Sequence, residues 1–161
     1  MSYKKKTWKE KLEGDKDFPK ILYLEENFPC WRALQKQGAK PGDSVVLVPG
    51  KEIYQLMKKV PKGKLLTLNK LCEILASNHG VDYCCSLTTG IYVNIAANAS
   101  EEMGEYLPYW RTIKNNGSLN PKYPGGIEAQ RKKLVEEGFN LVEKGRKNIR
   151  YLVEDYEKYL V

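Results

Sequence analysis

The most reactive side chains of this chain belong to four cysteines and one histidine. Cys72, His79, Cys84 and Cys85 lie close together in the sequence, and Cys30 stands apart. Thiolates and imidazole ligate zinc, and a thiolate is also a nucleophile. The spacing matches no paired C-x-x-C zinc motif, and adjacent Cys84 and Cys85 point in different directions on a strand or a helix. We therefore expect small, reduced, buried thiols and neither a metal site nor a cofactor.

A second segment of interest is Leu107-Pro108-Tyr109-Trp110-Arg111. Its reactive group is a tyrosine phenol, whose ordinary pKa of about 10 makes it a poor nucleophile at neutral pH. Upstream lies Val60-Pro61-Lys62-Gly63-Lys64, and downstream lie Tyr123-Pro124-Gly125-Gly126 and then Gln130 to Glu137-Gly138. Pro61 with Gly63, and Gly138, are expected to end helices.

In this order the segments resemble the C-terminal domain of the alkylguanine-DNA alkyltransferases, in which a nucleophilic cysteine lies in a Pro-Cys-His-Arg loop. The resemblance covers residues 51–153. It implies a helix-turn-helix that presents its second helix to the DNA minor groove. The matching positions are Pro61, Gly63, Gly90, Pro108, Arg111, Gly117, Tyr123, Gly125, Gly126, Gln130, Leu134, Glu137 and Gly138.

The departures from the family fall on its catalytic residues. Tyr109 stands at the cysteine position and Trp110 at the histidine position, so of the cysteine, histidine and glutamate only Glu137 remains. Without nucleophile and base, the family activity of methylated-DNA-protein cysteine methyltransferase is lost. The family includes noncatalytic alkyltransferase-like members that lack the cysteine, bind alkylated guanine and mark it for excision repair. The chain resembles these members, and we expect it to recognise an alkylated or flipped purine without methyl transfer.

The resemblance also implies the binding residues. The positions of an inserted arginine and a phosphate-rotating tyrosine are Leu87 and Leu68 here, and an apolar Leu87 can still act as a wedge in a base step. Residues 83–100 carry no charge, which suits close approach to a groove but equally suits a buried helix. We expect the base pocket to be formed by Tyr109, Trp110, Tyr123, Gly125 and Gly126. We expect DNA contacts from Thr67, Leu87, Thr88, Thr89, Gly90, Asn94, Arg111 and Lys114.

The composition fits a globular protein with a polyanionic partner. The 161 residues are 42% hydrophobic and 29% charged, with a net charge of +7. A basic surface suits double-stranded DNA, although it also occurs in proteins that bind no nucleic acid. Residues 51–110 are neutral in sum, so phosphate-binding side chains are expected from the flanks. The candidates are Lys62, Lys64, Arg111, Lys114, Lys122 and Arg131.

Apolar periodicity predicts the elements that position these residues. We expect a mainly α fold with small β elements: a winged helix-turn-helix-like domain over 51–161, preceded by an N-terminal α/β extension of unknown role over 1–50. A basic helix is expected over 4–13, and strands over 21–24 and 44–48. Helices are expected over 51–60, from the N-cap Thr67 to Asn78, from Ser86 or Thr88 to near Ala99, and over 127–137 with Ala129 or Gln130, Leu134 and Val135 inward. A turn at Asn116-Gly117 and a closing hairpin over 139–153 complete the domain.

No apolar run suits a bilayer-spanning or signal segment, so we expect a cytoplasmic protein. We also expect a monomer that binds duplex DNA and, in addition, excision-repair proteins. Two alternatives stay open. One is an active methyltransferase that uses a displaced cysteine, Cys84 or Cys85. The other is a winged-helix scaffold for a protein or small-molecule partner.

Overall fold

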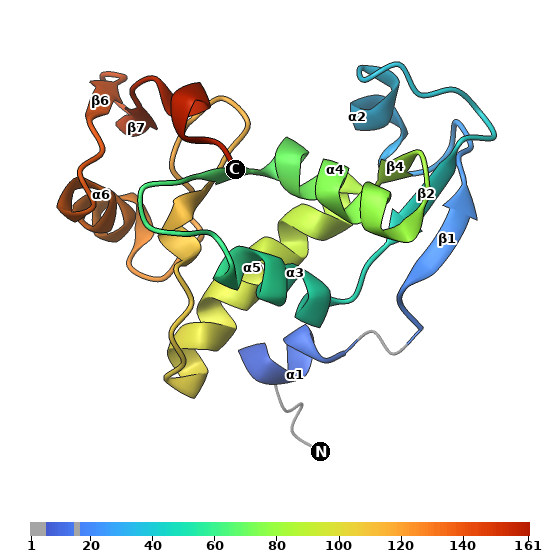
Figure 1. The fold of residues 1–161 in the computed structure, drawn as a ribbon, viewed down its shortest axis with the longest axis horizontal. Coiled ribbons are helices and arrows are strands. Elements are labelled where there is room, and N and C mark those ends of the chain that lie inside the picture. Colours follow the sequence, from blue (N-terminus) through green and yellow to red (C-terminus); the bar gives the residue numbers. More distant parts are fainter. Residues whose placement is uncertain (1–5, 15–16) are drawn as a thin grey trace.

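The structure is a computed structural model that describes residues 6–14 and 17–161. Helices dominate it, and the strands are short, as the sequence predicted (Figure 1). Three helices form the centre of the molecule: α3 (Gly50–Lys58), α4 (Leu68–His79) and α5 (Ser86–Met103). All three were predicted, with α5 running past Ala99 to Met103. Within the described residues no helix has both the length and the apolar character that a bilayer crossing requires.

Local sequence explains where α4 begins and ends. The hydroxyl of its N-cap residue, Thr67, accepts a hydrogen bond from the amide of Lys70. At the other end Gly80 adopts φ 65°, a left-handed conformation that glycine takes without strain. Between these ends Leu71 and Leu75 are fully buried against the central core. The helix is therefore held in a fixed register against α5.

The N-terminal region adds a small sheet beside these helices. Its elements are α1 (Trp8–Leu12), β1 (Lys20–Tyr23), α2 (Trp31–Gln35) and β2 (Ser44–Leu47). Strand β2 pairs antiparallel with β1 and parallel with β4 (Tyr83–Cys84), the strand directly before α5. Strand β4 was not predicted, because two residues are too few for a periodic pattern.

The two faces of this sheet bury different side chains. Val46 and Cys84 face the central core, whereas Val45 and Cys85 face a smaller cluster with Leu34 of α2. Adjacent Cys84 and Cys85 thus point to opposite sides, as expected for a strand. Helix α2 lies on the outer face of the sheet, next to the point where α5 begins (Figure 1).

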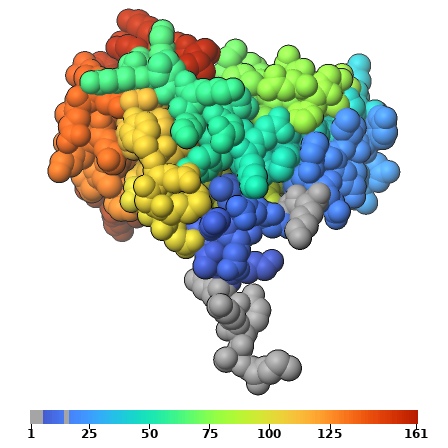
Figure 2. Space-filling model, turned by 60° about the horizontal axis from the view of Figure 1, so that its bottom comes forward, coloured from blue at the N-terminus to red at the C-terminus, as the bar shows by residue number. Residues whose placement is uncertain are grey.

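Helix α1 packs against α5 and is hydrogen-bonded to its C-terminal half. The carboxylate of Glu102 accepts hydrogen bonds from the amides of Trp8 and Lys9 at the start of α1. Gly50 permits the close approach, because a Cβ there would lie 2.7 Å from both the Leu12 carbonyl oxygen and the Tyr92 ring. In Figure 2 the atoms of α1 lie next to those of α3 and to the yellow atoms around the C-terminal end of α5. Positions 4 and 5 of the predicted helix lie outside the described residues.

The C-terminal part carries the Pro-Tyr-Trp-Arg segment and the helix behind it. A 3-10 turn, η1 (Tyr109–Arg111), leads into β5 (Thr112–Ile113), which pairs parallel with β3 (Leu66–Thr67). Helix α6 (Gly126–Glu136) and the antiparallel hairpin of β6 (Leu141–Lys144) and β7 (Arg150–Val153) follow, as predicted, before the 3-10 turn η2 (Tyr156–Tyr159).

One detail of α6 was predicted wrongly. Val135 was expected to face inward, but it is 51% exposed. Gln130 and Leu134, four residues apart, take the buried face, and a helix turns by about 100° between Leu134 and Val135. The predicted inward position of Leu134 is confirmed.

Candidate nucleic-acid interface

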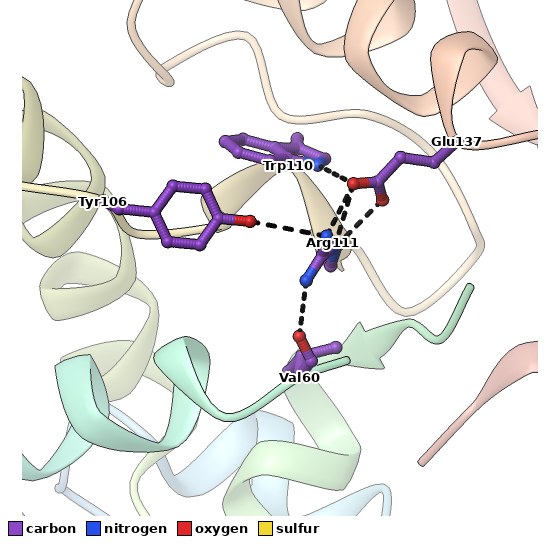
Figure 3. A network of polar contacts seen from close by, with 5 residues as sticks. All are labelled: Val60, Tyr106, Trp110, Arg111 and Glu137. Atoms are coloured by element: carbon purple, nitrogen blue, oxygen red, sulfur yellow. Dashed lines mark hydrogen bonds and ion pairs between the residues drawn. The ribbon is translucent and has the colours of Figure 1, made fainter. Parts of the chain in front are cut away.

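Arg111 lies at the centre of an internal network of polar contacts (Figure 3). Its Nη2 and Nε atoms donate to the two carboxylate oxygens of Glu137 at 2.6 Å and 2.9 Å, and Nη1 donates to the Val60 carbonyl at 2.8 Å. The indole Nε1 of Trp110 donates to the same carboxylate at 3.1 Å. The network thereby joins the end of α3, the η1 turn and the end of α6.

The Arg111–Glu137 pair is charged and almost removed from water, since the two side chains are only 8% and 10% exposed. Burial acts to raise the pKa of Glu137, but the hydrogen bonds from Arg111 and Trp110 outweigh it, so that this pKa is lowered. The predicted role of Arg111 in DNA contact is corrected here. Its guanidinium is engaged inside the fold by Glu137 and the Val60 carbonyl and is not at the surface.

Aromatic side chains fill the space where the base pocket was expected. Tyr109 is 3% exposed and packs edge-on against Trp110 and Tyr123, with ring centroids 5.4 Å and 5.3 Å away. Its hydroxyl donates to Glu101 at 3.2 Å, and burial followed by that carboxylate raises the pKa of Tyr109 to about 12. The phenol therefore stays neutral at physiological pH.

Tyr109 and Trp110 are accordingly part of the core and do not line an open pocket, which corrects the expectation for both. Tyr123 is also buried, and its hydroxyl donates to the Thr112 carbonyl at 2.8 Å. Gly125 and Gly126 adopt φ of 79° and 72° and start α6. Of the five predicted pocket residues, only Tyr123 borders the groove described next.

A groove of about 420 Å³ runs between the N-terminal half of α5 and the segment 112–123. Leu87, Gly90, Ile91 and Asn94 form the wall on α5, and Leu68 of α4 closes one side. The opposite wall contains Lys114, Asn120, Lys122 and Tyr123. None of the residues that line it is acidic or a cysteine. The groove is thus an apolar slot with amides and two cations at its rim.

The wall on α5 carries an exposed apolar ridge, formed by Leu87 and Ile91. These side chains are 51% and 53% exposed and, being four residues apart, stand on one face of the helix. Across the groove, the amide of Asn120 donates to the Asn94 side-chain oxygen at 2.7 Å. Residues 83–100 thus have one face buried in the core and another at the surface.

The predicted DNA-contacting residues divide into two groups. Leu87, Gly90, Asn94 and Lys114 line the groove. The others lie in the protein interior or partly so. Thr88 is half-buried and accepts a hydrogen bond from the Cys85 thiol.

Two threonines need the same correction as Arg111. Thr67 is 5% exposed and serves as the N-cap of α4, and Thr89 is fully buried beside the Cys84 thiol. A helix-turn-helix pattern places both near the DNA, but it does not show which side of the helix faces the core. The remaining candidate cations, Lys62, Lys64, Lys122 and Arg131, are exposed.

All four cysteines are free and buried, as expected. Cys84 contacts the Thr89 hydroxyl at 3.2 Å and Cys85 contacts the Thr88 hydroxyl at 3.4 Å, on opposite sides of β4. His79 is paired with Glu52 at 2.7 Å. Across the described parts of the chain, no three potential metal ligands come together. Neither Cys84 nor Cys85 borders the groove. The alternative of an active methyltransferase that uses one of these cysteines therefore has no thiol at the groove.

Sequence reasoning missed Ile91, Asn115 and Asn120 as groove residues. Ile91 could have been found, since it repeats the apolar character of Leu87 one helical turn later. The asparagines carry no comparable pattern, because a loop places them.

Comparisons with known proteins place the fold. No family model matches the chain, and no curated protein matches it. Among solved structures, S. pombe Atl1 in complex with damaged DNA containing O6-carboxymethylguanine is similar, with a TM-score of 0.51 at 18% identity. S. pombe ATL in complex with DNA gives a TM-score of 0.52 at 16% identity. Each comparison covers 70% of this chain and 93% of the other. The chain therefore has the fold of the alkyltransferase C-terminal domain.

Proposed function

We propose that this protein is a noncatalytic, alkyltransferase-like DNA-binding protein that recognises an alkylated or flipped purine in duplex DNA. The observation that carries the proposal is the groove beside α5, with the exposed Leu87 and Ile91 ridge on one wall and Lys114 and Lys122 on the other. It occupies the helix-turn-helix of a fold whose similar solved structures hold DNA.

The chemistry of the groove supports a nucleic-acid ligand. Its cations suit phosphates, its amides suit base edges, and its apolar ridge suits insertion between bases. A volume of about 420 Å³ falls within the range of about 300–1,000 Å³ that is typical of small-molecule sites, so the groove has room for one extruded base. The aromatic residue Tyr123 also lines the groove.

We expect DNA binding without alkyl transfer because of where the tyrosine and cysteine side chains lie. The phenol of Tyr109 is buried and neutral, and no cysteine lines the groove. A thiol that is buried in apolar surroundings is inert, because the reactive species is the exposed thiolate. We propose that the bound protein instead marks the site for excision-repair proteins, acting as a cytoplasmic monomer.

A titration tests the proposal. Duplexes that carry either plain guanine or O6-alkylated guanine at one position are titrated at 50 and 200 mM salt. We expect binding that weakens with salt and is tighter for the alkylated duplex. Equal affinity for both duplexes would contradict recognition of the alkylated base. No binding even at low salt would favour a scaffold for another partner. Intact-mass measurement after incubation should show no gain of an alkyl group.

A further inference from the structure

The N-terminal region contains a basic segment that the proposed function leaves unused. Between Glu26 and Asp43 there is no acidic residue, whereas Arg32, Lys36 and Lys40 all fall within this interval. All three cations are exposed. Arg32 and Lys36 belong to α2 and its C-cap, so a short helix fixes their positions.

Helix α2 is held against the beginning of α5. Cys30, directly before α2, and Cys85, the N-cap residue of α5, are buried in one small cluster. Trp31 packs against the same small cluster, which also includes Leu34 and Val45. In Figure 1 α2 lies beside β4, at the end of the molecule where α5 starts.

This position is close to the first turn of α5, which carries Leu87. The exposed ridge of Leu87 and Ile91 therefore has two sets of cations in its neighbourhood. Lys114 and Lys122 line the groove, and Arg32 and Lys36 stand on α2.

A helix that enters a groove of duplex DNA has a phosphate backbone on each side of it. Cations on elements next to the helix suit contact with such a backbone. Cys85 precedes Leu87 by only two residues, or about 3 Å along the helix axis, so α2 is within reach of DNA that covers the ridge. Charge complementarity thus specifies the occupant as phosphate backbone.

We infer that the N-terminal region is a DNA-contacting element, in which Arg32 and Lys36 of α2 bind phosphates in addition to those bound by Lys114 and Lys122. The inference rests on the proposed function, since it requires the ridge to lie in a DNA groove. It enlarges the binding surface beyond the groove itself.

The test compares two double variants of the full chain. In the first, Arg32→Gln and Lys36→Gln remove the cations of α2. In the control, Lys58→Gln and Lys59→Gln remove two exposed cations at the C-terminal end of α3, which do not line the groove. All four residues are exposed, so thermal unfolding should be unchanged in both variants and serves to verify folding.

DNA affinity is measured at 50 and 200 mM salt. Removing two phosphate contacts should lower the slope of log affinity against log salt by about 2. The affinity ratio of wild type to the α2 variant should therefore fall about tenfold between the two salt concentrations. The α3 variant should follow the wild type. An α2 variant that matches the α3 variant in affinity and slope would overturn the inference.

A second measurement locates the phosphate contacts. Neutral methylphosphonates are placed at single positions along either strand of the duplex. The positions at which Arg32→Gln causes no further loss of affinity should differ from those at which Lys114→Gln causes none. If Arg32→Gln causes the same further loss at every position, the inference is wrong while the proposed function stands. If the wild type binds no DNA, both fail.

Discussion

The Arg111 network and the groove beside α5 differ in two respects: how closely their residues resemble a known motif, and how exposed their side chains are. The network contains the residues that most resemble a known motif, yet its side chains are buried and bind one another. The groove contains Leu87, Ile91 and Lys114, which match no reactive motif and are exposed. In this chain the motif-like residues hold the fold together, and the surface open to a ligand is built from ordinary side chains.

The largest expected effect tests the structural side of this comparison. Arg111→Met leaves the Glu137 carboxylate buried without its partner, which should cost about 3–5 kcal/mol of unfolding free energy. Urea unfolding measures it. The double variant Arg111→Met, Glu137→Gln should recover part of the loss, because no charge is then stranded. A loss below 1 kcal/mol in the single variant would contradict an internal structural role.

Protonation of Glu137 should give a smaller effect of the same origin. Because its folded pKa lies below the unfolded value of about 4.3, the pair stabilises the fold above that pH. This contribution is lost as the pH falls through the folded pKa. Urea unfolding of wild type and Glu137→Gln between pH 7 and pH 3 should show their difference in stability shrinking toward acid pH. A difference that is constant with pH would exclude this linkage.

On the groove side, Leu87→Asp should weaken DNA binding by about tenfold or more, since it replaces the apolar wedge with a charge that phosphates repel. Val135→Asp on α6 is the matched control, because Val135 has the same exposed fraction of 51%. Fluorescence anisotropy with labelled duplex measures both. Equal losses in the two variants would show that the ridge has no special role.

Lys114→Gln should have a more modest effect on the same titration. Loss of one phosphate contact lowers the salt slope by about 1, so that the affinity ratio to wild type changes about threefold between 50 and 200 mM salt. Lys58→Gln on α3 is the single-site control. An unchanged slope would place Lys114 outside the DNA contact.

The smallest effect is expected at the position of the family nucleophile. Tyr109→Phe removes only the hydrogen bond to Glu101, whose carboxylate then returns to water, for a loss of about 0.5 kcal/mol. DNA affinity should not change, because Tyr109 does not border the groove. A tenfold loss of DNA affinity in Tyr109→Phe would indicate that the phenol contacts DNA and would contradict the buried arrangement.

The sequence alone indicated most of the elements. Apolar repeats such as Leu71 and Leu75, the N-cap Thr67 and the stop at Gly80 are local features, and local geometry decides them. The order of the Pro-Tyr-Trp-Arg segment, the glycine pair and the Glu-Gly end of α6 pointed to the alkyltransferase fold that the solved structures share. Strand β4 was not predicted from the sequence, since its pairing partner β2 is distant in the sequence.

What only the tertiary structure decided is which polar and aromatic groups face water. Arg111, Thr89 and Tyr109 have residue types that serve equally well at a surface or in a satisfied interior, and their burial depends on partners such as Glu137, Cys84 and Glu101 from other elements. The placement of α2 beside the start of α5 depends likewise on a sheet formed between remote strands. A linear pattern fixes the face that a residue occupies on its own element, and packing among elements fixes whether that face is covered.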